Sequence, residues 1–101
     1  MERTDDAVIR ELRRIPGVGP SVAGDLLALG IRRVEDLRGE SPDDLYERLC
    51  QLQGVRVDRC MLYTFRCAIY YATAPIHQPE LLRWWAWKDR ELTPELLAGP
   101  S

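Results

Sequence analysis

The sequence predicts an all-α fold, a compact domain of five to six helices. Apolar residues recur every three or four positions in successive segments, which is the spacing of one buried helix face. Glycines and prolines separate these segments and mark the helix ends. One helix start is especially clear. Ser41 can cap the first turn, Pro42 suits its first position, and two following aspartates complement the helix dipole.

The composition is ordinary for a soluble globular protein and indicates a single domain over residues 1–101. The 101 residues are 46% hydrophobic and 30% charged. No segment approaches the roughly 20 apolar residues of a membrane span. The first six residues lack the apolar core of a signal peptide, so we expect a cytoplasmic protein.

The charge balance is evidence against strong DNA binding. The formal net charge is −2 and the pI is near 5.4. Domains that depend on non-specific nucleic-acid contacts are usually more basic than this. A local basic patch could still bind DNA despite the acidic net charge.

Residues 15–23 join two predicted helices through a tight turn. Pro16 disfavours helix at the residue before it, and Pro20 suits the first turn of a new helix. Gly17 and Gly19 can adopt backbone conformations that other residues avoid. The second helix therefore begins with unpaired N–H groups beside a turn without side chains, an arrangement that can hold a DNA phosphate.

The helices on either side of this turn are predicted over residues 5–14 and 20–29. Thr4 or Asp5 can cap the first, and Gly30 provides a left-handed stop for the second. The end of the first helix carries a group of basic residues, Arg10, Arg13 and Arg14. These arginines form either a solvated face that complements the dipole or a set of phosphate contacts.

Three further helical segments follow, a connector over residues 32–39, a helix closed by Gly54 and a long helix over residues 58–73. The predicted buried face of the helix that Gly54 closes consists of Leu45, Leu49 and Leu52, and Tyr46 and Cys50 widen it. Residues 53–58 form a second, poorer hairpin with one glycine. The long helix has three tyrosines that we expect to keep their hydroxyl groups near solvent, Tyr63, Tyr70 and Tyr71.

Two prolines break the helical pattern between residues 74 and 79, and we expect the tail over residues 74–98 to pack on the helical core of residues 5–73. A short helix is predicted over residues 80–87. It carries Trp84, Trp85 and Trp87. This block is interpreted either as a lid over the core or as a partner or dimer surface, since aromatic anchors dominate interfaces.

No enzyme, cofactor or metal site is predicted. The two glycines at positions 17 and 19 lack the preceding apolar strand of a dinucleotide site and the following Lys-Ser/Thr of a P-loop. His77 lies in a proline-bounded loop. Cys60 and Cys67 would lie about 10 Å apart on one helix, too far for a disulfide or a shared zinc ion. With Cys50, they are expected to be reduced thiols.

The turn resembles the helix-hairpin-helix motif of DNA repair and recombination proteins. The matching residues are Ile15, Pro16, Gly17, Val18, Gly19, Ala23, Gly30 and Ile31. In that family the hairpin amides bind the phosphate backbone without reading sequence. The resemblance implies a phosphate site made by Gly17, Val18, Gly19, Ser21, Arg13 and Arg14. DNA-binding members often have lysine where this chain has Ser21.

The resemblance extends beyond the motif. Residues 5–73 resemble the doubled helix-hairpin-helix, or SAM-like, domain with a degenerate second copy. The whole chain is similar to the bacterial pathogenicity locus family of small helix-hairpin-helix proteins, and its first half resembles the C-terminal domain of TfoX-type competence regulators. The matching stretches are residues 12–23, 30–31 with 34–37, 49–60 continuing into 65–68, and 84–87. These resemblances imply a fold and a bacterial source more than a function.

Two functions remain open. The first is weak, non-sequence-specific DNA binding through the hairpin amides. The alternative is a protein-interaction or homodimerisation module with no nucleic-acid role, which the acidic pI, Ser21 and the tryptophan block favour.

Overall fold

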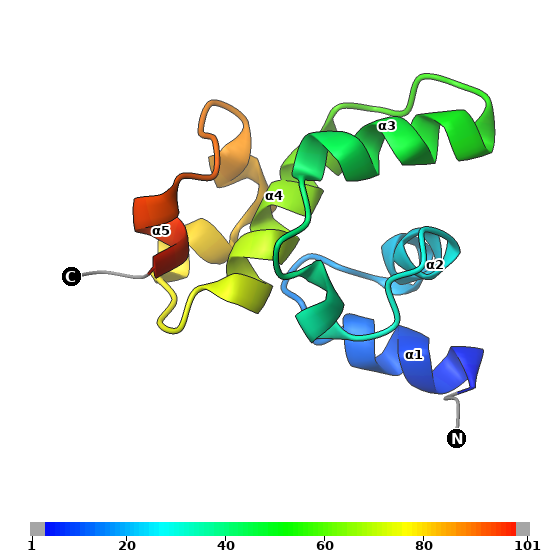
Figure 1. Cartoon of the computed structure of the whole chain (residues 1–101), viewed down its shortest axis with the longest axis horizontal. Coiled ribbons are helices and arrows are strands. Elements are labelled where there is room, and N and C mark those ends of the chain that lie inside the picture. Colours follow the sequence, from blue (N-terminus) through cyan, green and yellow to red (C-terminus); the bar gives the residue numbers. More distant parts are fainter. Residues whose placement is uncertain (1–3, 99–101) are drawn as a thin grey trace.

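The computed structural model describes residues 4–98, and within this range it contains helices and no strands (Figure 1). The all-α prediction is therefore confirmed. The elements, in chain order, are α1 (Asp5–Leu12), α2 (Pro20–Ala28), the 3₁₀ helix η1 (Val34–Leu37), α3 (Pro42–Gln53), α4 (Cys60–Thr73), the 3₁₀ helices η2 (Pro79–Leu82) and η3 (Trp84–Trp87), and α5 (Pro94–Ala98). None of these helices has the length and apolar character that crossing a membrane requires.

The helix ends follow the local signals in the sequence. The Thr4 hydroxyl accepts a hydrogen bond from the Ala7 N–H at 3.2 Å and caps α1. The Ser41 hydroxyl does the same for α3, accepting from the Asp44 N–H at 3.3 Å. Gly54 ends α3 in the left-handed conformation, with φ of +71°. The predicted caps of both helices are confirmed.

The end of α2 is closed by two backbone hydrogen bonds. The Gly30 N–H donates to the Leu27 carbonyl at 2.9 Å, and the Ile31 N–H donates to the Leu26 carbonyl at 3.0 Å. Gly30 has φ of +92°, and Ile31 is buried against the core. This is the Schellman arrangement, in which a glycine with positive φ turns the chain back onto the last turn of the helix.

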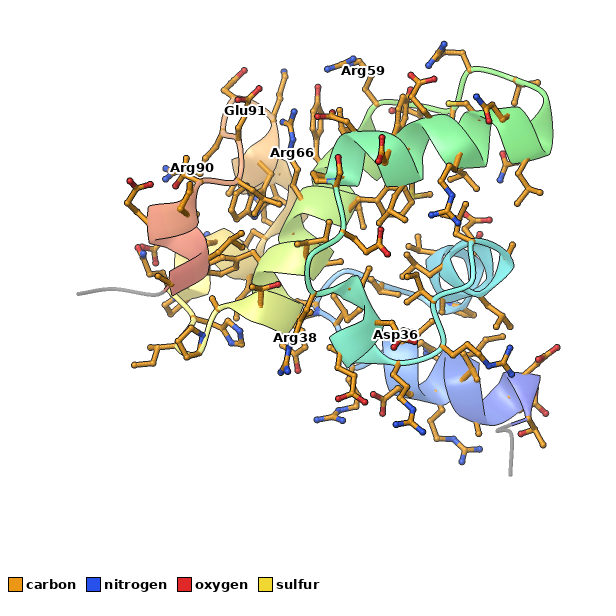
Figure 2. All side chains as sticks on the ribbon, viewed as in Figure 1. Asp36, Arg38, Arg59, Arg66, Arg90 and Glu91 are labelled. Atoms are coloured by element: carbon orange, nitrogen blue, oxygen red, sulfur yellow. The ribbon has the colours of Figure 1, made fainter. Side chains whose placement is uncertain are left out.

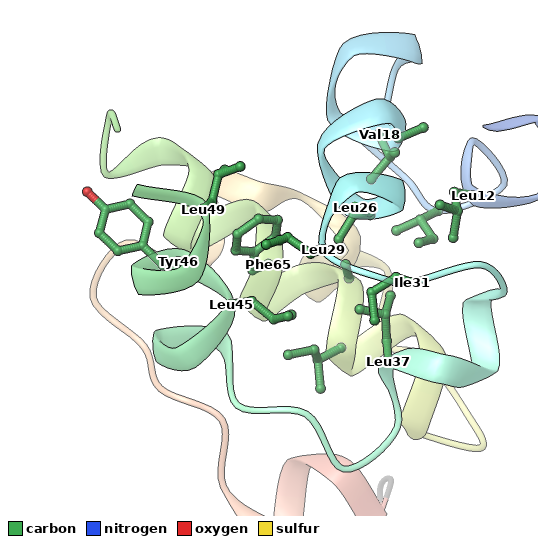
Figure 3. Close-up of a cluster of buried hydrophobic side chains, with 14 of the residues drawn as sticks. Leu12, Val18, Leu26, Leu29, Ile31, Leu37, Leu45, Tyr46, Leu49 and Phe65 are labelled. Carbon is green, nitrogen blue, oxygen red and sulfur yellow. The ribbon is translucent and has the colours of Figure 1, made fainter. Parts of the chain in front are cut away.

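Helix α4 lies between two hydrophobic clusters. In Figure 1 it runs between the group formed by α1, α2 and α3 and the tail that contains α5. The larger cluster draws side chains from all four long helices (Figure 3), including Leu12, Leu26, Leu37, Leu45, Leu49 and Phe65. The smaller cluster contains Cys67, Tyr70, Ala74, Leu81 and Trp87. The tail thus covers a side of α4 that the first four elements leave uncovered.

Two expectations about burial were wrong. Leu52 is 58% exposed, because the buried face of α3 also includes Tyr46 and Cys50, which places Leu52 at its edge in the last turn. Tyr70 is completely buried, and its hydroxyl accepts a hydrogen bond from the Gln78 N–H at 2.8 Å. The tail satisfies this hydroxyl in place of solvent.

Several charged side chains bind backbone groups at helix ends (Figure 2). The Arg38 Nε donates to the Ala72 carbonyl at 2.7 Å, near the end of α4. The Arg48 Nη2 donates to the Leu29 carbonyl at 2.7 Å, at the end of α2. The Asp36 carboxylate accepts the N–H groups of Arg32 and Arg33 at 3.0 and 3.1 Å. These residues stabilise helix ends, so part of the surface charge has a structural use.

Candidate nucleic-acid interface

Residues 16–21, called the glycine turn below, connect α1 to α2. The Val18 N–H donates to the Ile15 carbonyl at 3.1 Å, and Gly17 has φ of +81°. With Pro16 at the second position, these are the features of a type II turn, in which the third residue needs positive φ. Gly19 has φ of −92° and ψ of −173°, which is extended backbone open to any residue. Only one of the two glycines is therefore required by conformation.

The start of α2 exposes backbone N–H groups. Gly19 caps the helix without a side chain, and Pro20 occupies its first position. The Ala23 N–H donates to the Gly19 carbonyl at 2.9 Å and begins the helical pattern. Within residues 4–98 the structure shows no acceptor for the N–H groups of Gly17, Gly19 and Ser21. Gly17 and Ser21 are exposed.

Val18 differs from its neighbours in the turn. Its N–H is already bonded inside the turn, and its side chain is only 6% exposed. Val18 anchors the turn to the larger hydrophobic cluster. Its contribution at this site is therefore the shape of the turn.

The basic residues beside the turn are exposed. Arg13 and Arg14 follow directly after α1, and Arg10 lies in its last turn. The Arg14 Nη1 is 3.5 Å from a carboxylate oxygen of Glu11, whose other oxygen accepts the Val34 N–H at 3.3 Å. In the part of the chain that the structure describes, Arg13 has no ion pair or side-chain hydrogen bond. Its charge is fully available to solvent or a ligand.

The three tryptophans occupy three different environments. Trp87 is completely buried, and its indole N–H donates to the Leu81 carbonyl at 2.9 Å. Trp84 is half-buried, and its Cδ1 lies 3.4 Å from the position of a β-carbon on Gly17. Trp85 meets Trp84 edge-on with 5.6 Å between ring centres and is 56% exposed. Trp87 is a core residue, so the surface of this block that a partner could contact consists of Trp85 and part of Trp84.

The remaining candidate residues have local roles. Cys50 and Cys67 are buried, Cys60 is exposed, and all three are free thiols. Burial raises the pKa of Cys67 to about 11. The His77 Nε2 lies 2.8 Å from the Tyr71 carbonyl oxygen, and its ring stacks on that of Tyr71. Among the described residues, no group of three or more His, Cys, Asp or Glu side chains is arranged to hold a metal ion.

One charged residue was missed by the sequence interpretation. Arg66, in the middle of α4, is only 8% exposed and lines a cavity of about 810 Å³. The sequence feature that could have identified Arg66 is its position inside the apolar run of residues 65–69. A charge at such a place needs a partner, and the sequence alone does not show which.

Comparisons with known proteins identify relatives of the chain. The Cdd1 family, described as pathogenicity locus, matches residues 5–92. Mitomycin resistance protein McrB of Streptomyces lavendulae is 36% identical over 92 residues, covering 88% of this chain and 79% of that protein. No solved structure matches the chain. Because the family match extends from α1 to the end of the tryptophan block and beyond, the chain belongs to the pathogenicity locus family.

Proposed function

We propose that the glycine turn binds the phosphate backbone of DNA weakly and without reading base sequence. The observation that carries the proposal is the exposed start of α2. There the N–H groups of Gly17, Gly19 and Ser21 lack acceptors within residues 4–98. Helix α2 has nine residues, so its peptide dipoles place partial positive charge at the same point. N–H groups and a helix dipole directed at one place favour an oxyanion.

The arginines beside the turn add the long-range attraction that a polyanion requires. Arg13 and Arg14 are exposed, and a third cation, Arg10, is one helical turn away. A single turn reaches few phosphates, so binding should be micromolar or weaker at physiological salt. A weak, salt-dependent contact is compatible with a chain of net charge −2. The proposed function is binding alone, with no catalytic step and no cofactor.

Family membership and the name of the Streptomyces relative support a bacterial protein but give no biochemical activity. The proposal therefore rests on the geometry of the glycine turn and on its resemblance to the helix-hairpin-helix motif. In such a motif the backbone binds the phosphate directly, and the neighbouring arginines add attraction for the rest of the polyanion.

Fluorescence anisotropy with labelled duplex and single-stranded DNA carrying 5′-hydroxyl ends tests the proposal across a salt series. The double variant R13Q/R14Q should lower affinity and reduce the slope of log K against log salt by roughly 0.9 for each lost phosphate contact. The control R33Q/R56Q removes the same charge from exposed residues outside the turn, which pair with Glu35 and Glu47. Absence of binding at low salt would overturn the proposal, as would an equal loss in both double variants.

The second candidate function is self-association through Trp85. It is favoured by the 56% exposure of this indole, since large exposed aromatic side chains are common anchors of interfaces. Sedimentation analysis over a range of protein concentrations tests it. A dimer that dissociates in the W85A variant supports this function, and a monomer at every concentration excludes it.

A further inference from the structure

A surface cavity of about 810 Å³, wide open to solvent, lies where α4 meets the loop that precedes α5. Its cationic side chains come from separate segments of the chain, as Figure 2 shows for three of them. The four cations are Arg59, Arg66, Lys88 and Arg90. None of them forms an ion pair within residues 4–98. The cavity uses no residue of the glycine turn, so it is a separate site.

Arg66 is the fixed part of this cavity. It is 8% exposed, and its Nη1 donates to the carbonyl oxygens of Trp87 at 2.8 Å and Arg90 at 3.3 Å. Its guanidinium carbon lies 5.7 Å from the centre of the Tyr63 ring. These contacts hold the guanidinium in one place and hold the loop against α4. A binding group that is fixed before the ligand arrives loses little conformational entropy on binding.

The charge of Arg66 has no counter-ion within the described residues. A guanidinium has five N–H donors, and only Nη1 is used, so Nε and Nη2 have no acceptor among residues 4–98. Carbonyl dipoles offset part of the cost of burying this charge, but an anion would offset far more of it. Arg66 lines the cavity, so an anion bound there would lie next to this side chain.

We propose that this cavity binds a compact oxyanion, a phosphate group, between Arg66 and the exposed side chains of Arg59, Lys88 and Arg90. The planar guanidinium matches the spacing of phosphate oxygens and binds them in pairs. Three carboxylates also line the cavity, from Asp89, Glu91 and Glu95. They repel any anion, and the repulsion grows with each further phosphate of a long polyanion, so the ligand is free phosphate or the terminal phosphate of a small phosphomonoester. Both sources present a phosphate group that is largely dianionic near neutral pH.

The test is a titration of the full chain with inorganic phosphate, followed by the NMR signals of the arginine Nε–H groups. Chloride keeps the ionic strength constant. The Arg66 signal, assigned by its loss in R66K, should shift and saturate. K88Q and R90Q should each weaken binding about tenfold, the effect of losing one hydrogen bond to a charged group. R56Q is the matched control, because Arg56 is exposed and pairs with Glu47 outside the cavity.

A second arm identifies the source of the phosphate. Competition of adenosine monophosphate with inorganic phosphate, with no effect of adenosine, supports a phosphomonoester, and binding of inorganic phosphate alone supports the free ion. A shift that does not saturate overturns the proposal, and so does equal binding by K88Q, R90Q and R56Q. R66K can fail to fold, but K88Q and R90Q change exposed loop residues and keep the test decisive. R13Q/R14Q should leave phosphate binding here unchanged, which separates this site from the glycine turn.

Discussion

The indole of Trp84 lies against Gly17, with its Cδ1 atom 3.4 Å from the position that a β-carbon on Gly17 would occupy. Gly17 also has φ of +81°, a conformation that residues with a β-carbon rarely adopt. The tail of the chain thus forms part of the surroundings of the glycine turn. A β-carbon at position 17 would strain the backbone and would pack closely against the indole.

The G17A variant should therefore lower the free energy of unfolding by about 1–2 kcal/mol, because alanine is strained at positive φ. Its matched control is G24A within α2, where nothing lies within 4 Å of the new β-carbon. Alanine in a helix interior should stabilise the protein by about 0.5–1 kcal/mol. Urea denaturation measures both values. Changes of the same sign in the two variants would contradict the geometry described for Gly17.

Ser21 is an exposed residue in the first turn of α2, where a lysine would bring a cation to the proposed phosphate site. The S21K variant should bind DNA more tightly and steepen the salt dependence of log K by about one ionic contact. Anisotropy titrations over a salt series measure the slope. S21Q, which has a similar size and no charge, should bind as the wild type does. An unchanged slope in S21K would show that DNA does not approach α2 at this point.

Substitutions of Trp87 and Trp85 should have different effects, because the first is a core residue and the second lies at the surface. Trp87 is completely buried between α4 and the tail, so W87A should lower the free energy of unfolding by about 3–5 kcal/mol. Trp85 is 56% exposed, so W85A should change it by less than about 0.5 kcal/mol. Denaturation curves check both. Acrylamide quenching adds an independent measurement, because W85F should remove most of the readily quenched emission.

Cys60 should react faster than the other two thiols of the folded protein, since Cys50 and Cys67 are buried. The Asp58 carboxylate, through its hydrogen bond and its charge, raises the pKa of Cys60. The thiolate fraction therefore rises only at a pH above the ordinary range for cysteine. D58N should lower this pKa and speed iodoacetamide alkylation at pH 8, whereas E80Q should have no effect. Equal alkylation rates in D58N and the wild type would exclude control by Asp58.

The helix boundaries could be predicted because their causes are local. Thr4 and Ser41 each bond an N–H group three residues ahead, and Gly30 and Gly54 adopt positive φ at the end of a helix. Such signals depend on a few neighbouring residues, so they can be read directly from the sequence.

The burial of Tyr70 and the surroundings of Arg66 could not be predicted, because they depend on contacts between distant segments. Tyr70 is buried because residues 78–87 return to cover it, and Arg66 is held by carbonyl groups from the same part of the tail. Helical periodicity identifies an apolar face but does not show which polar groups the rest of the chain will satisfy. For the same reason, the cavity around Arg66 had no signature in the spacing of its residues. The interpretation of the arginines beside the glycine turn stays a prediction.

Helix α4 contributes side chains to both hydrophobic clusters, so cleavage of the chain after α4 would affect the smaller cluster. The connection between α4 and η2 includes Ile76, which is 61% exposed, so a protease can approach it. Loss of everything after that connection would uncover Cys67 and Tyr70 on the far side of α4. The remaining fragment would keep its caps and its larger cluster yet carry a bare apolar flank. Cleavage at this accessible loop, followed by dissociation of the tail, would therefore leave an aggregation-prone fragment.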